Sequence, residues 1–209
     1  VVALEVLHSA FLVLAVYHVG LCLVLPAWLT RRAGGSWRRH LRTLGLLDTR
    51  AGRTWPRAAG LTVLGAATAV AVVLAWSWWP GLFPDRERIA GALATWGVDA
   101  AGTAPLLLLI AMLNGPAEEA FWRGWLERRP ARSPLGPGLR AVLFTSYHVV
   151  TVGALAPHVA AAAAMLAVVL AAAVVWTWSR RRWGTLWPAI AMHTGATLGY
   201  VAVCRAIMA

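Results

Sequence analysis

Six long apolar segments, separated by short polar loops, set the strongest limit on how this chain of 209 residues can fold. Hydrophobic residues make up 60% of the sequence and charged residues only 13%, which is too little polar surface for a water-soluble domain. A helix needs about 20 mainly apolar residues to cross a bilayer. Because helices satisfy their own backbone hydrogen bonds in lipid, the sequence predicts an all-α, polytopic transmembrane helical bundle. The six segments cover about residues 6–29, 58–79, 101–126, 139–155, 158–178 and 185–204.

An amphipathic segment at residues 37–47 adds a further helix that does not cross the membrane. Four of its apolar residues share one helical face, which is typical of a helix in the membrane interface. They are Trp37, Leu41, Leu44 and Leu47. Six spans is our count, and seven or eight helices are the alternatives because kinked and interfacial helices blur hydropathy. No repeat divides the chain, so we expect a single integral-membrane domain over residues 1–209.

The basic residues indicate how the bundle is oriented. All 19 are arginines, and with 8 acidic residues they give a net charge of +11. They gather in the loops after the first, third and fifth spans. The positive-inside rule therefore predicts that these loops are cytoplasmic, in what we expect to be the inner membrane of a bacterium. No basic face with interleaved aromatic residues is found, which argues against nucleic acid as a partner.

Two of the acidic residues, Glu118 and Glu119, stand side by side in the third apolar segment. An ionised group deep in a bilayer costs about 3 kcal/mol or more, so such residues usually face a protein interior or a wet cavity. Arg123 follows Glu119 at i+4, on the same helix face, and can pair with it. Glu118 is rotated by about 100° and can point elsewhere. We interpret Glu119 as structural and Glu118 as the candidate general base, with a purely structural ion cluster as the alternative.

Two histidines on later helices are predicted to meet Glu118. Glu118, His148 and His193 lie roughly 12 to 16 Å along the helix axis from arginines on the cytoplasmic side. These arginines are Arg128, Arg140 and Arg182, respectively. Three helices would then bring one carboxylate and two imidazoles to a similar depth. Glu118 and His148 can hold a nucleophilic water, and His193 can donate to the oxyanion, with the Thr197 hydroxyl on the same face.

These residues form a pattern that resembles a known family. Glu-Glu-x-x-x-Arg at 118–123, Phe144-x-x-x-His148, and His193 after Leu-Trp-Pro-Ala-Ile resemble the motifs of the CPBP (Abi) family. Its members are CAAX-processing and bacteriocin-processing intramembrane proteases, related to the type II CAAX prenyl endopeptidase. The resemblance implies a family-like catalytic core at about residues 101–205. It also implies that Glu118 and His148 activate water and that His193 helps to form the oxyanion hole.

By the same resemblance, Glu119, Arg123 and Phe144 would support the site. The family often has an asparagine four residues after the last histidine, where this chain has Thr197. An intramembrane endopeptidase of the glutamate type is therefore expected, with its site toward the cytoplasmic half of the bilayer. Its partners would be the lipid bilayer and a membrane-anchored protein or peptide: a CAAX-like tail, a leader peptide or a C-terminal sorting anchor.

Two questions about the chemistry stay open in the sequence. The preferred mechanism requires no cofactor, but the family has been described as metalloproteases. Glu118, His148 and His193 could supply three ligands to a divalent metal such as zinc. The alternatives to an enzyme are a non-catalytic immunity or scaffold protein of the same fold, and a small transporter that uses Glu118 and the histidines.

Overall fold

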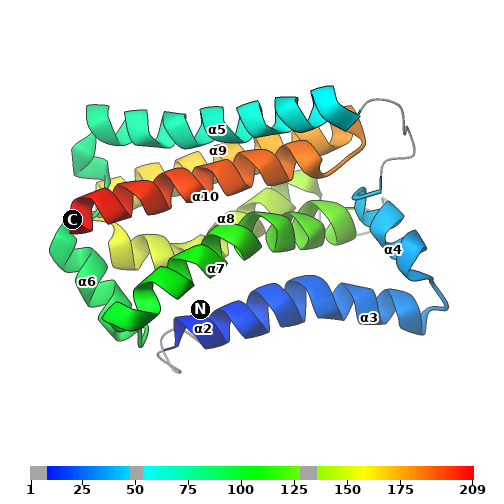
Figure 1. The fold of residues 1–209 in the computed structure, drawn as a ribbon, viewed down its shortest axis with the longest axis horizontal. Helices are drawn as coiled ribbons and strands as arrows, with labels where there is room; N and C mark the ends of the chain where they lie inside the picture. The colour runs from blue at the N-terminus through cyan, green and yellow to red at the C-terminus, as the bar shows by residue number, and fades with distance from the viewer. Residues whose placement is uncertain (1–8, 48–53, 128–135) are drawn as a thin grey trace.

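The computed structural model describes residues 9–47, 54–127 and 136–209, and these ranges form helices without a strand (Figure 1). The predicted all-α class is confirmed. The helices are α2 (Ala10–Val13), η1 (Leu14–Val24), α3 (Leu25–Arg32), α4 (Trp37–Leu44), α5 (Thr54–Trp78), η2 (Pro80–Leu82), α6 (Arg86–Thr95), α7 (Ala100–Glu119), η3 (Ala120–Leu126), α8 (Pro137–Leu155), α9 (Val159–Trp183) and α10 (Trp187–Met208). The segments η1 and η3 are π-helical and η2 is a 3₁₀ turn.

Within the described ranges, five helices are long and apolar enough to cross a membrane, and they correspond to five of the six predicted spans. They cover residues 10–32, 58–78, 138–155, 159–183 and 187–208. The first predicted span began at Val6, and the residues before Ser9 lie outside the described ranges. The remaining predicted span, 101–126, is helical as α7 and η3. It lies inside the bundle, against α10 and η1.

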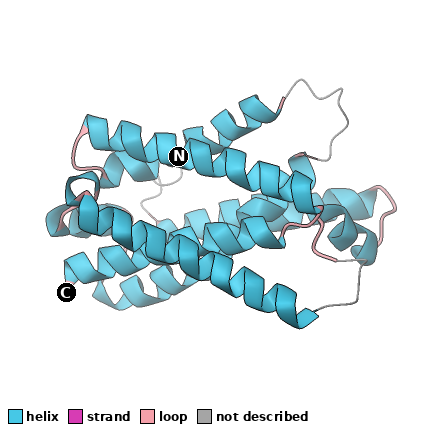
Figure 2. Ribbon diagram, turned by 90° about the horizontal axis from the view of Figure 1, so that it is seen from above, coloured by secondary structure: helices cyan, strands magenta, loops and turns pink. Residues whose placement is uncertain are grey.

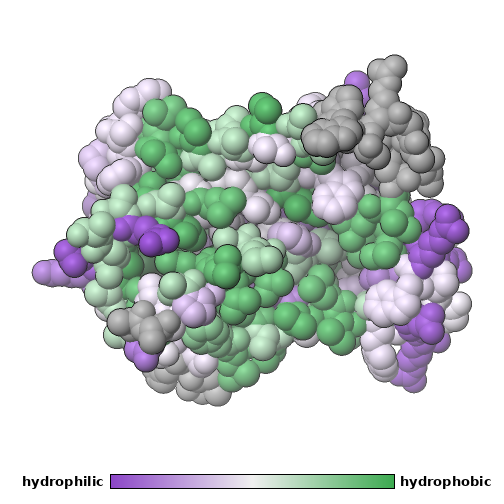
Figure 3. Space-filling model, in the orientation of Figure 1, coloured by the Kyte–Doolittle hydropathy of each residue, from purple (hydrophilic) through white to green (hydrophobic). Residues whose placement is uncertain are grey.

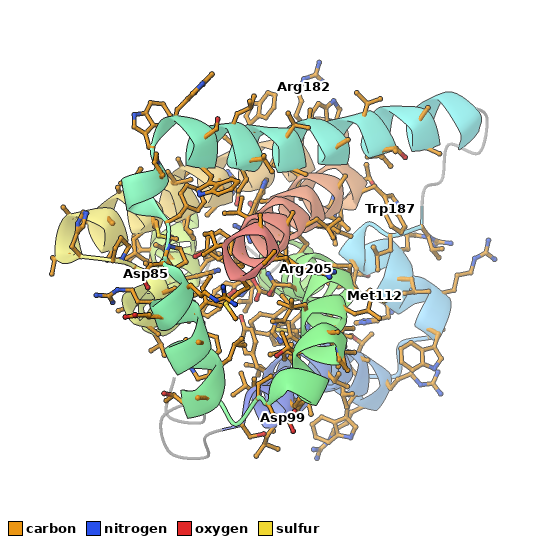
Figure 4. All side chains as sticks on the ribbon, turned by 60° about the vertical axis from the view of Figure 1, so that its left-hand side comes forward. Asp85, Asp99, Met112, Arg182, Trp187 and Arg205 are labelled. Carbon is orange, nitrogen blue, oxygen red and sulfur yellow. The ribbon has the colours of Figure 1, made fainter. Side chains whose placement is uncertain are left out.

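The helices run lengthwise between two polar ends (Figures 1 and 2). A broad hydrophobic band covers the middle of the visible face, and hydrophilic residues gather at both ends (Figure 3). One end, here called the Arg-rich end, holds α4 and the arginines that close α3 and α9. The opposite end holds Asp85, at the start of α6, and Asp99, at the start of α7 (Figure 4). This distribution is what an integral membrane protein requires.

The predicted interfacial helix forms as α4 and ends at Leu44, one turn before the predicted boundary. The Ser36 side chain accepts a hydrogen bond from the backbone N–H of Arg39, which caps the helix start. Leu44 packs with Ala120, at the start of η3. Thus α4 closes the Arg-rich end of the bundle beneath the segment that carries the glutamates, and Leu47 lies beyond the helix.

Small residues let α10 approach α5 closely. A Cβ added at Gly195 would collide with the carbonyl oxygen of Gly65, and one at Gly199 would lie 2.6 Å from the carbonyl oxygen of Ala69. Gly195 and Gly199 thus form a G-x-x-x-G face, which allows helix backbones to touch in a membrane. The contact fixes the position of α10, the helix that carries His193.

A methyl group at Gly195 is therefore expected to destabilise the bundle. Gly195→Ala should lower the unfolding free energy by about 1–3 kcal/mol, as overpacking usually does. Thermal unfolding in detergent would measure the shift. Gly153→Ala on α8 is the matched control, because nothing lies within 4 Å of a Cβ at this exposed helical position. Equal unfolding temperatures for the two variants would contradict the packing argument.

Candidate active site

The paired glutamates lie at the end of α7, in the interior of the bundle. Glu118 is 1% exposed and Glu119 is fully buried, while Arg123 and His193 are each 3% exposed. Four ionisable side chains are thus withdrawn from solvent together. Charges in such a place persist only when they are paired and hydrogen-bonded, so their partners decide what each glutamate can do.

Arg123 neutralises Glu119. Its Nη1 donates to Glu119 Oε1 at 3.0 Å, which is the i, i+4 pair expected from the sequence. Its Nη2 donates to the backbone carbonyl of Ala173 at 3.3 Å, across the bundle on α9. The guanidinium lies 4.1 Å from the centre of the Phe144 ring, a cation–π contact. Glu119 and Arg123 therefore join η3 to α8 and α9, with Phe144 covering the pair.

The contact with Glu119 determines which ring nitrogen of His193 carries the proton. His193 Nδ1 lies 2.9 Å from Glu119 Oε1, and a carboxylate can only accept, so Nδ1 carries the proton. In the neutral ring Nε2 then has a lone pair. Nε2 faces Asn114 Nδ2 at 3.2 Å and lies 3.9 Å from Glu118 Oε2. The imidazole stacks on Trp176, with ring centres 4.2 Å apart, which holds it in this orientation.

His148 presents a lone pair to the same interior. Its Nδ1 lies 2.9 Å from the backbone carbonyl of Phe144, so Nδ1 donates and Nε2 remains an acceptor in the neutral ring. The Phe144 ring contacts both histidines, with ring centres 4.9 Å from His148 and 6.0 Å from His193. His193 Nε2 in turn lies 3.9 Å from Glu118 Oε2, so the three predicted residues belong to one cluster, formed by α7, α8 and α10.

The two glutamates differ in the partners of their oxygens. Glu119 Oε1 is bound by both Arg123 and His193, and its Oε2 is buried without a hydrogen-bond partner among the described residues. Glu118 Oε1 lies 3.2 Å from His18 Nε2. Its Oε2 also lacks a hydrogen-bond partner within the described ranges, and it faces the Nε2 atom of His193. Glu118 thus keeps one free acceptor beside two imidazoles and no arginine, as a general base requires.

Two residues of this cluster were missed in the sequence. His18 sits in η1, and its Nε2 lies 2.9 Å from Asn114 Oδ1. Asn114 precedes Glu118 by one helical turn, and this i, i+4 spacing was the available signal. His18 lies 13 residues before Arg31, about 20 Å along a helix, a depth comparable with that of the other site residues. The π-helical segments η1 and η3 both border the cluster, as such segments often do at functional sites.

Thr197 has its hydroxyl directed away from a substrate position. Its Oγ1 donates to the backbone carbonyl of His193 at 3.1 Å and accepts from Asn114 Nδ2 at 3.2 Å. The hydroxyl proton is thus used within the helix, and the role of Thr197 as a donor to the oxyanion stays a prediction. A threonine inside a helix commonly bonds back to the carbonyl four residues earlier, and here that bond uses its only proton.

The side chains do not fit a metal centre. Within the described residues, no three His, Cys, Asp or Glu side chains are arranged to hold a metal ion. Glu118, His148 and His193 share one interior, and the Nδ1 atoms of both histidines are hydrogen-bonded, so only their Nε2 atoms could bind a metal. His193 Nε2 faces an amide nitrogen rather than a vacant ligand position. The three-ligand zinc set considered from the sequence is thus not formed.

A cavity of about 320 Å³ opens at the Arg-rich end, next to the site. It reaches Arg123, whose guanidinium binds Glu119. An approach from this end is therefore separated from the glutamates by a single side chain. The lining residues are Arg123, Glu127, Arg180, Arg181 and Gly184.

Comparison with known families matches residues 100–199 to the model described as Rce1-like, type II CAAX prenyl endopeptidase Rce1-like. The matched range includes α7, η3, α8, α9 and most of α10. It therefore covers Glu118, His148 and His193 but not His18. Searches of curated proteins and of solved structures gave no match.

Proposed function

We propose that the protein is an intramembrane endopeptidase whose attacking water is activated by Glu118 and His148. The premise is the match of residues 100–199 to the Rce1-like model of type II CAAX prenyl endopeptidases. The observation that carries the proposal is the free, buried Oε2 of Glu118 beside two imidazoles. Glu119 also has an oxygen without a partner among the described residues, but its carboxylate is paired with Arg123. The carboxylate of Glu118 instead contacts imidazoles, which suits a general base.

The two acceptors suit a water molecule. Glu118 Oε2 and His148 Nε2 each offer a lone pair, so one water can donate a hydrogen bond to both. Its own lone pair is then left for attack on a peptide carbonyl carbon. Glu118 takes the proton as the C–O bond forms and gives it to the leaving amine as the C–N bond breaks. The products are a carboxylic acid and an amine, and Glu118 returns to its starting state.

The substrate we propose is a protein or peptide anchored in the same membrane. Hydrolysis inside a bilayer needs a protein-lined chamber that admits both water and peptide. The cavity at the Arg-rich end supplies a route for water to the edge of the site. By the positive-inside rule this end faces the cytoplasm, and we propose that the protein resides in a bacterial inner membrane.

A panel of three probes tests the function. The purified protein is placed in liposomes with internally quenched peptides: a farnesylated peptide ending in a CAAX sequence, a leader peptide, and a single-span peptide with a C-terminal anchor. We expect cleavage of at least one probe by the wild type. Failure to cleave any probe, at protein levels where folding is verified, would favour the non-catalytic or transporter alternatives.

Treatment of the protein with a chelator tests the proposal that the mechanism uses no metal ion. Because the site residues do not form a three-ligand set, kcat/KM should be unchanged after incubation with 1,10-phenanthroline and removal of the chelator complex. The measurement uses whichever probe the wild type cleaves. Loss of activity that zinc restores would overturn the proposed glutamate mechanism.

A further inference from the structure

We infer that the side-chain amide of Asn114 is the donor that stabilises the oxyanion, and that His18 is a positioning residue that keeps this amide in its donating orientation. The inference rests on the proposed peptidase function and deepens it. It assigns the oxyanion contact to α7 and brings in a residue of the first membrane helix, outside the matched domain.

His193 is not able to serve as this donor in its neutral form. Its Nδ1 proton is committed to Glu119 at 2.9 Å. Its Nε2 lies 3.2 Å from Asn114 Nδ2, and an amide nitrogen donates but does not accept. In this contact Nε2 must therefore accept. The donor in the contact between His193 and Asn114 is therefore the Asn114 amide.

Three neighbours fix which way the amide faces. His18 Nε2 lies 2.9 Å from Asn114 Oδ1 and 3.2 Å from Glu118 Oε1, so it must donate to these two oxygens. The Nδ2 group then points to His193 Nε2 and Thr197 Oγ1. A flipped amide would place its oxygen against the lone pair of His193 and its hydrogens against those of His18. The observed orientation gives both the oxygen and the nitrogen of the Asn114 amide a partner of the right kind.

Close packing holds the amide beside the candidate base. Asn114 lies four residues before Glu118, on the same face of α7. A Cβ at the next residue, Gly115, would lie 2.9 Å from the backbone nitrogen of Thr194, so α7 and α10 meet at this level. A carbonyl attacked by water from Glu118 therefore has the Asn114 amide as a neighbour. Preorganised donors of this kind are the usual means of stabilising charge that develops in a transition state.

The step needs no proton transfer at Asn114. As the water oxygen bonds to the carbonyl carbon, the carbonyl π electrons move to oxygen. This oxyanion accepts the N–H that Asn114 otherwise gives to Thr197. When the C–N bond breaks, the carbonyl re-forms and the amide returns to the hydroxyl. Asn114 thus binds the transition state more strongly than the substrate.

Asn114→Leu tests the donor, because leucine has a similar volume and no polar atoms. With a probe that the wild type cleaves, kcat should fall by about 10²–10³-fold, as on loss of one oxyanion donor, with little change in KM. Ser146→Ala, at an exposed position on α8, is the control and should keep wild-type kcat. Tyr147→Phe removes another buried hydroxyl near Glu118. Loss of kcat in that variant with normal kcat in Asn114→Leu would overturn the inference.

A rescue keeps the test informative if Asn114→Leu folds poorly. The Thr197 hydroxyl lies 3.2 Å from Asn114 Nδ2, so an amide at position 197 can reach the same place. Asn114→Ala should lose kcat, and Asn114→Ala with Thr197→Asn should regain at least about tenfold, within the range that one donor contributes. Absence of rescue in a folded double variant counts against the assignment.

His18 is tested by the identity of its substitutes. His18→Gln retains an N–H donor and should keep most of kcat, whereas His18→Leu should lower it. In a background of Asn114→Leu, His18→Leu should have little further effect, because the two residues act as one unit. Additive losses would show that His18 does not act through Asn114.

The proposed function and this inference fail in different ways. A folded wild type that cleaves no probe overturns the function, and the inference with it. A wild type that is active and insensitive to Asn114→Leu overturns the inference alone and leaves Glu118 and His148 in their roles.

Discussion

Replacing Glu118 by glutamine is expected to lower kcat by about 10²–10⁴-fold, the usual contribution of a general base, while the protein stays folded. Glutamine has the shape of glutamate and keeps an oxygen that accepts from His18. What it loses is the basic Oε2, which has no hydrogen-bond partner among the described residues. The structure therefore loses little on this change, and the chemistry loses its proton acceptor.

The measurement compares initial rates of the wild type and Glu118→Gln on the same probe in liposomes, with thermal unfolding of both proteins as a check on folding. Glu87→Gln is the matched control, because Glu87 is exposed on α6 at the opposite end from the Arg-rich loops. It should retain full activity. A Glu118→Gln protein that cleaves as fast as the wild type would remove Glu118 from the mechanism, and the non-catalytic alternatives would then be preferred.

Contacts within one helix could be predicted from the sequence more readily than contacts between helices. The spacing of Glu119 and Arg123 is a property of one helix, and their ion pair was predictable from it. We predicted that Glu118, His148 and His193 lie at a similar depth from the number of residues between each of them and an arginine on the cytoplasmic side. This count works because all the helices cross the same bilayer, so the distance of a residue along its helix gives its depth in the membrane.

Contacts that depend on helix rotation and neighbour choice were not predictable in this way. His18 contacts Asn114 across 96 residues of sequence, and depth alone does not indicate that η1 packs against α7. The Thr197 hydroxyl was expected to face a substrate, but its rotamer bonds to its own helix. The third predicted span was found as a helix, formed by α7 and η3.

Removing Arg123 should have the largest effect on stability. Arg123→Leu leaves Glu119 as a fully buried carboxylate without its cation, and breaking a buried pair in this way costs about 3–5 kcal/mol. The same change removes the hydrogen bond to the Ala173 carbonyl and the contact with the Phe144 ring. Thermal unfolding in detergent should therefore show a large decrease, whereas Arg86→Leu at an exposed position on α6 should cause little change.

A second substitution separates the loss of charge balance from the loss of packing. In Arg123→Leu with Glu119→Gln, the uncompensated charge is gone and the amide oxygen still accepts from His193 Nδ1. Part of the stability should return relative to Arg123→Leu alone, and the coupling between the two sites should be clearly non-additive. Simple addition of the two losses would mean that Glu119 is not held by Arg123. The contrast with Glu118→Gln, which is expected to abolish catalysis at little cost in stability, assigns separate tasks to two adjacent carboxylates.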